Sequence, residues 1–146
     1  MPTPPTLAPA FQCAMPAQLE SIAPMQQALT AWAADRGVPA GTLVRIGLML
    51  DELMTNIVIH GYRGEAGRME LEADVAERSL HLTLIDFAFA YDPLQAPVPD
   101  TTLDMDSREI GGLGVHFVRS MADAVRYQRT EHRGRAANEL HIVKQF

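Results

Sequence analysis

The strongest constraint on the fold is a change of hydrophobic periodicity near Gly67. Before this residue, apolar side chains recur every three or four positions, the spacing of a helix with one buried face. After it, apolar and polar residues alternate, which is typical of a strand that buries one of its two faces. The sequence therefore predicts helices packed on a sheet, in an α+β protein.

Two helices are predicted in the first part of the chain, over residues 17–36 and 40–60. Gly37 and Pro39 separate them, because both residue types interrupt a helix. Pro24 either kinks the first helix or marks its true start. The apolar stripes expected to face the core contain Leu19, Ile22, Met25, Leu29 and Trp32 in the first helix and Leu43, Ile46, Leu50, Leu53 and Ile57 in the second.

The alternating segments predict strands. Residues 10–16 form a short first strand, and residues 69–75 and 80–86 alternate on either side of a polar turn. Two such runs with a short join form an antiparallel hairpin. Residues 124–130 and 138–146 form a second hairpin, joined near EHRGR.

The segments between the two hairpins complete the expected order of elements. Residues 93–110 hold several prolines and acids without a steady period, so they predict a long loop, and residues 112–123 predict a helix. The order predicts a two-layer α/β sandwich, with a mixed, mostly antiparallel sheet covered on one face by about three helices. Residues 11–146 then form a single domain, behind a flexible, proline-rich leader at residues 1–10.

Composition narrows the classes of function. The 146 residues carry 12 basic and 18 acidic side chains, a net charge of −6, which argues against a basic groove for nucleic acid. A nucleotide stays compatible with this charge, because it needs only a local positive potential or a metal ion. Cys13 is the single cysteine, which excludes an internal disulfide and a cysteine-based zinc cluster. No apolar run reaches the length of a membrane span, and the leader lacks the features of a secretion signal, so the expected location is the cytoplasm.

A carboxylate stands at an unusual place in the third predicted strand. Alternation puts Asp86 on the same side as Leu80, Leu82 and Leu84, which is the side that faces the core. A buried charge is costly unless it has a specific partner. Two interpretations stay open: Asp86 binds such a partner, or the strand ends there and the side chain turns to water.

The second predicted helix carries a polar row in an otherwise apolar sequence. Glu52, Asn56 and His60 follow one another at intervals of four residues, which places them on one side of the helix. Carboxylate and amide oxygens suit a magnesium ion, which takes few ligands from a protein and the rest from phosphate and water. The alternative is a solvated helix edge, since the pattern E-x-x-x-N occurs by chance in many helices.

Three glycines stand at the start of the third predicted helix: Gly111, Gly112 and Gly114. Glycine runs at helix starts often hold a phosphate on backbone N–H groups. No lysine follows to complete a Walker-type loop, so a phosphate held here needs another source of positive charge.

Taken together, three boxes are similar to those of a known family. In this order, DELMTNIVIHGY, DFAFAYDP and IGGLGVHFVRSMADAVRYQR resemble the GHKL superfamily of ATP-binding domains. Within it, the chain looks most like the anti-sigma-factor serine/threonine kinases and their bacterial relatives, over residues 15–146. The resemblance implies a Bergerat-type ATP-binding fold, with ATP and Mg²⁺ as cofactors.

The resemblance also implies roles for the residues of the first two boxes. Glu52 would be the general base and Asn56 the magnesium ligand, with His60 near the phosphates. Asp86 would accept a hydrogen bond from the adenine amino group, which would explain an inward carboxylate at a strand end.

In the third box, the resemblance implies that backbone N–H groups of Gly111, Gly112 and Gly114 receive the phosphates. Magnesium on Asn56 would then supply the charge that a P-loop lysine supplies elsewhere. Arg108, just before the glycines, is either a phosphate clamp or an ordinary exposed arginine of the loop.

The chain departs from the family pattern in two places. Both glycines of the adenine box are alanines here, Ala88 and Ala90, and alanine resists positive φ and adds a methyl group near the base. In the last strand, Asn138 stands near the place where relatives often carry a threonine. Both departures bear on the affinity for ATP.

The function implied by the resemblance is that of a serine/threonine protein kinase, which phosphorylates an antagonist protein with ATP and sequesters a sigma factor. Relatives of this kind often form homodimers, and neither nucleic acid nor a membrane is expected as a direct partner. The alanines favour an alternative, a non-catalytic or weakly nucleotide-binding interaction module that regulates a signalling partner. A third alternative, a metal-dependent hydrolase, needs Glu52, His60 and Asp86 to converge and leaves the glycine box unexplained.

Overall fold

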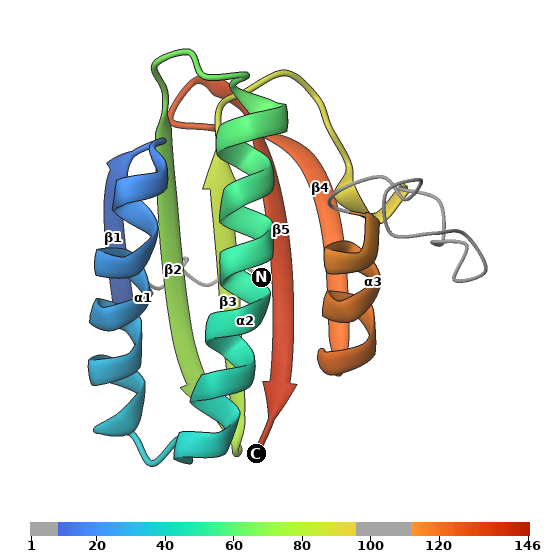
Figure 1. Cartoon of the computed structure of the whole chain (residues 1–146). Helices are drawn as coiled ribbons and strands as arrows, with labels where there is room; N and C mark the ends of the chain where they lie inside the picture. The colour runs from blue at the N-terminus through green and yellow to red at the C-terminus, as the bar shows by residue number, and fades with distance from the viewer. Residues whose placement is uncertain (1–8, 96–111) are drawn as a thin grey trace, which may run out of the picture.

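The computed structural model describes residues 9–95 and 112–146 (Figure 1). Its strands are β1 (Phe11–Pro16), β2 (Arg68–Ala76), β3 (Ser79–Asp86), β4 (Ala124–His132) and β5 (Arg135–Gln145). Its helices are α1 (Leu19–Ala34), α2 (Ala40–Asn56) and α3 (Gly112–Met121), with a π-helical turn η1 (Ile57–Gly61) and a 3₁₀ turn η2 (Pro93–Gln95).

The strands form one sheet, and the helices cover one of its faces. The strand order is β1-β2-β3-β5-β4, and every pair of neighbours is antiparallel. Figure 1 shows α1, α2 and α3 side by side in front of the sheet, with α3 over β4. The predicted two-layer α+β sandwich is therefore confirmed, whereas the prediction of a mixed sheet was wrong, since the five described strands pair only antiparallel. Among the described residues, no helix is long and apolar enough to cross a membrane.

The core lies between the two layers and contains most of the predicted stripe residues. Its fully buried side chains include Met25, Leu29, Met49, Leu50, Met54, Met69, Leu71, Leu80, Leu82, Leu84 and Ile142. The prediction was wrong for Leu19, whose side chain is 51% exposed. Leu19 is the first residue of α1. A helical side chain covers the turn before its own Cα, and no such turn precedes Leu19.

The second helix ends earlier than predicted. The α-helical hydrogen bonding of α2 stops at Asn56, and the chain continues through the wider turn η1, where Tyr62 N–H bonds the Ile57 carbonyl at 2.9 Å. A π-turn holds more residues than an α-turn, so the spacing of four no longer puts His60 directly below Asn56. The predicted polar row is therefore interrupted after Asn56.

The second hairpin is longer and more tightly closed than predicted. β5 already pairs with β4 at Arg135, and the join is Arg133–Gly134, with φ values of 52° and 78°. Two successive residues with positive φ match the right-handed twist of a hairpin. This turn sets the register of β4 against β5.

One charged side chain on the face of the sheet without helices is buried. Glu70 alternates with the inward-facing Met69 and Leu71, yet it is only 1% exposed. Arg133 at the tip of the β4–β5 hairpin reaches across to it, with Nη2 at 3.2 Å from Oε1, and Arg68 Nε lies 3.4 Å from Oε2. The hairpin tip therefore contacts the start of β2, and no local sequence pattern predicts this contact between distant segments.

Candidate functional site

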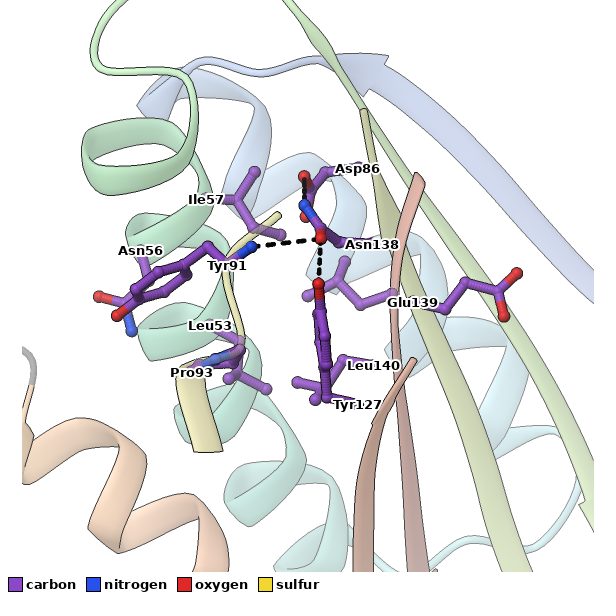
Figure 2. A pocket seen from close by; sticks show the side chains of 11 residues that line it. Leu53, Asn56, Ile57, Asp86, Tyr91, Pro93, Tyr127, Asn138, Glu139 and Leu140 are labelled. Carbon is purple, nitrogen blue, oxygen red and sulfur yellow. Dashed lines mark hydrogen bonds between the residues drawn. The ribbon is translucent and has the colours of Figure 1, made fainter. Parts of the chain in front are cut away.

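A cavity lies between α2 and the ends of β3 and β5 (Figure 2). Its empty volume is about 360 Å³, part of which is open to solvent. Its walls are mostly apolar and come from α2, η1, the sheet and the segment after β3: Leu53, Asn56, Ile57, Leu84, Asp86, Tyr91, Pro93, Tyr127, Asn138, Glu139 and Leu140. A small number of polar groups in an apolar hollow is typical of a small-molecule site.

The cavity brings together residues from the first two predicted boxes. Asn56 at the end of α2 and Asp86 at the end of β3 both line it, and each is only 7% exposed. Figure 2 shows the two side chains on opposite walls of the same hollow. Of the two interpretations of Asp86, the structure therefore supports the buried carboxylate with specific partners.

The Asp86 carboxylate is held by its neighbours through one oxygen. Oδ1 accepts the Ala88 backbone N–H at 3.0 Å and the Asn138 Nδ2–H at 2.8 Å. Burial raises the pKa of Asp86 above its ordinary value, although these two hydrogen bonds and the nearby Arg129 act in the opposite direction. Burial therefore disfavours the charged form of Asp86 in the folded protein, relative to the same group in water.

This raised pKa predicts a stability difference for Asp86→Asn. The folded state favours protonated Asp86, so the wild type loses stability as pH rises through the raised pKa, whereas an amide has no charge to lose. We expect the variant, without ligand, to have the higher Tm at pH 7. The two Tm values should converge below the ordinary aspartate pKa of 3.8. Thermal melts from pH 3.5 to pH 8 measure this, and a wild type that is the more stable protein at pH 7 would contradict it.

Asn138 is the centre of the polar network beside Asp86. The two residues lie directly opposite each other in the β3–β5 register. Besides its bond to Asp86, Nδ2 donates to the Phe89 carbonyl at 3.0 Å. Oδ1 accepts from Tyr127 Oη–H, from Arg129 Nη1–H at 3.1 Å and from the Tyr91 N–H at 3.4 Å. One amide therefore ties the strands to the segment that follows β3.

The two alanines of the adenine box do not strain this segment. The described non-glycine residues with positive φ are Arg63, Glu77, Arg78 and Arg133, so neither Ala88 nor Ala90 needs the conformation that favours glycine. Ala88 is buried and its carbonyl accepts Arg129 Nη1–H at 2.9 Å, whereas Ala90 is exposed. The segment is also held from the other side, where Phe87 N–H donates to Tyr62 Oη at 2.8 Å.

The structure separates the other predicted residues of α2 and η1. Glu52 is half-buried one turn before Asn56, and His60 is exposed on η1; neither lines the cavity. Within residues 9–95 and 112–146, no three His, Cys, Asp or Glu side chains are grouped so that they could hold a metal ion. Glu52, His60 and Asp86 therefore do not form the metal centre that the hydrolase alternative requires.

The third box is only partly described. Gly112 is the first residue of α3 and Gly114 lies in its first turn. The predicted phosphate clamp Arg108 and the first glycine, Gly111, lie outside the described residues. Their proposed contacts with phosphate stay predictions.

Sequence reasoning missed the tyrosine of the far wall. Tyr127 lines the cavity because β4 pairs with β5 so that Tyr127 lies opposite Leu140 and Arg129 lies opposite Asn138. The position of the turn would have predicted Tyr127. A two-residue turn at Arg133–Gly134 fixes the pairing of β4 with β5.

Comparisons with known proteins agree with the fold and the boxes. Residues 15–144 match the family described as the histidine kinase-like ATPase domain. The serine/threonine-protein kinase BtrW of Bordetella bronchiseptica is 33% identical over 85 residues, which is 58% of this chain and 60% of that protein. A chain in the crystal structure of the SiaB–SiaC complex from Pseudomonas aeruginosa superposes with a TM-score of 0.62 at 15% identity, covering 92% of this chain and 89% of that one. This last similarity concerns the fold alone.

Proposed function

The chain belongs to the histidine kinase-like ATPase domain family, and on this premise we propose that it binds Mg²⁺–ATP in the cavity beside Asp86. We further propose that it transfers the γ-phosphoryl group to a serine or threonine of an antagonist protein, and that it sequesters a regulatory partner such as a sigma factor. The similarity to BtrW, a serine/threonine-protein kinase, supports the reaction class. The chain spans only 60% of that relative, so partner and acceptor belong to the proposal.

The observation that carries the proposal is the buried carboxylate in an apolar hollow. Asp86 is 7% exposed at the end of β3, and the hollow beside it is walled by Leu53, Ile57 and Leu140. Aliphatic walls suit the faces of a purine, and a carboxylate accepts its exocyclic amino group. A structural role alone gives no reason to keep a desolvated charge at this position.

Asn56 is the residue best suited to a metal ion in this site. Asn56 is only 7% exposed and its side chain lines the cavity. An amide oxygen is a ligand that Mg²⁺ accepts, and the ion takes its other ligands from phosphate and water. When bound, the ion would neutralise the charge of the phosphates. The backbone N–H groups at the start of α3, from Gly112 onward, would receive the phosphate oxygens.

Glu52 is the candidate general base. It lies on α2 one turn before Asn56 and is half-buried, so it can be reached from outside by an acceptor hydroxyl while staying close to the metal ligand. Its carboxylate would take the hydroxyl proton as the oxygen attacks the γ-phosphorus, while the bond from that phosphorus to the bridging oxygen breaks and ADP leaves.

A second candidate function rests on the internal bonding of the site. Asp86 Oδ1 already has two partners within the protein, Ala88 and Asn138. The network is thus stable without nucleotide, as expected of an interaction module that regulates a signalling partner and binds ATP weakly or not at all.

Calorimetric titration with ATP, with and without Mg²⁺, separates the two functions. For the kinase we expect magnesium-dependent binding, weakened at least about tenfold in Asp86→Asn, because a hydrogen bond to a charged group contributes about 1.5–3 kcal/mol. Asp74→Asn, an exposed aspartate on β2, serves as the matched control and should bind like the wild type. A wild type that binds no ATP at millimolar concentration excludes the kinase and leaves the interaction module.

A further inference from the structure

We propose that a second hollow, outside the cavity beside Asp86, binds an acidic peptide segment of a partner protein. The walls of this arginine hollow come from the turn after α2, the segment after β3 and the start of β5, and they include Arg63, Glu65, Phe87, Phe89 and Arg135. Its empty volume is about 1010 Å³, part of which is open to solvent. Figure 1 shows the three segments at the same end of the sheet. No nucleotide takes part in this binding, so the inference stands apart from the proposed function.

Each arginine of the hollow is stacked on an aromatic ring of the segment after β3. Arg63 Cζ lies 4.7 Å from the centroid of the Phe89 ring, and Arg135 Cζ lies 4.6 Å from the centroid of the Phe87 ring. Stacking uses the face of a guanidinium and leaves the N–H groups at its edge for hydrogen bonds. Both arginines are exposed, so a ligand from outside can reach these donors.

Within the described parts of the chain, no ion pair neutralises these two arginines. Arg68 and Arg133, at the same end of the sheet, both pair with the buried Glu70. In residues 9–95 and 112–146, no carboxylate forms an ion pair with Arg63 or Arg135. The whole chain has a net charge of −6, so this hollow is a local positive region on an acidic protein. Such a region attracts an anionic group.

The other residues of the hollow favour a peptide over a free anion. A guanidinium binds a carboxylate or a phosphate through two parallel N–H···O bonds, so the arginines alone accept either group. Glu65 also lines the hollow, and its charge repels a compact anion such as phosphate, whereas it can accept a backbone N–H of a peptide. Phe89 is 46% exposed and offers an apolar surface that phosphate cannot use. The expected occupant is therefore a peptide segment whose acidic side chains meet the two arginines.

A segment held in the arginine hollow would lie next to the cavity beside Asp86. Ala88 and Phe89 line the hollow, whereas Asp86 and Tyr91, from the same stretch of chain, line the cavity. Asn138 Nδ2, on the cavity wall, donates to the Phe89 carbonyl at 3.0 Å. A peptide in the hollow would therefore contact the segment that forms one wall of the cavity.

The test measures the dissociation constants of two fluorescein-labelled peptides, hexaglutamate and hexaglutamine, for the full chain without nucleotide, by fluorescence anisotropy at low ionic strength. The wild type should bind hexaglutamate at least about tenfold more tightly than hexaglutamine, because two ion pairs form. Arg63→Gln and Arg135→Gln should each weaken the binding of hexaglutamate by at least about fivefold, the factor that one exposed ion pair supplies.

Arg36→Gln is the matched control for both variants. Arg36 is also exposed and stacked on an aromatic ring, with Cζ 4.4 Å from the centroid of the Trp32 ring, but it lies just after α1 and does not line the hollow. The substitution changes the net charge of the chain equally, so this variant should bind hexaglutamate like the wild type.

Three outcomes overturn the inference. One is a wild type that binds the two peptides equally well, which can be measured even if no variant folds. Another is an equal loss in the Arg36 variant and in folded variants of the hollow, which would show attraction to the net charge alone. The third is displacement of hexaglutamate by inorganic phosphate below the dissociation constant of the peptide, which would make the hollow a phosphate site. None of them bears on the proposed function, which the titration with ATP tests.

Discussion

Glu52→Gln is expected to lower the rate of phosphoryl transfer by about a hundred- to ten-thousand-fold, the range that a positioned general base contributes. The amide keeps the size of the side chain but cannot accept the proton of the attacking hydroxyl. The affinity for ATP should be unchanged, because Glu52 does not line the cavity. Transfer is measured as labelled phosphoprotein formed from γ-labelled ATP and a cell extract that supplies acceptor proteins, and affinity by calorimetry.

The neighbouring carboxylate provides the control for this variant. Asp51 is exposed on α2 and is rotated by about 100° from Glu52 around the helix axis. Asp51→Asn makes the same chemical change and should leave the transfer rate near that of the wild type. Full activity in Glu52→Gln would remove Glu52 from the role of base, and an equal loss in both variants would point to the helix rather than to one carboxylate.

The largest effect on stability is expected for Leu82→Ala. Leu82 is 2% exposed in the centre of the sheet, in the core cluster between β3 and the helices. Removing most of its side chain leaves a cavity and should lower the free energy of unfolding by about 2–5 kcal/mol. Urea denaturation followed by circular dichroism measures the change, from the midpoint at an unchanged slope.

The same substitution at the surface supplies the comparison. Leu19, on the predicted apolar stripe of α1, is 51% exposed, so Leu19→Ala should change the free energy of unfolding by no more than about 0.5 kcal/mol. Equal losses in the two variants would mean that the α1 stripe packs as the sequence predicted and that Leu19 is buried in solution.

The candidate site illustrates how far single residues can be predicted. Asp86 follows from alternation, because three inward leucines precede it in the same strand, and Asn56 follows from its place on an apolar helix. Both line the cavity. Their meeting could not be derived from these patterns, because each pattern reports only which face of its own element is buried.

Asn138 shows more clearly what a sequence pattern cannot predict about a site residue. The resemblance placed it only near the position where relatives often carry a threonine, and an error of one residue in a strand reverses the face. The β3–β5 register puts it directly opposite Asp86, and the β4–β5 register brings Arg129 to the same point. The segment around Ala88 is also tied to this amide, and Ala88 does not adopt a positive φ.

The sequence by itself determined the kinds of elements and their order, since the spacing of apolar side chains is a local property tied to burying one face. Only the tertiary structure decided the π-turn that displaces His60, the burial of Glu70 beneath Arg133, and the convergence of three donors on Asn138. Each of these depends on how segments far apart along the chain pack against one another. That packing follows from the energy of the whole sheet and its helices together, which no short stretch of sequence contains.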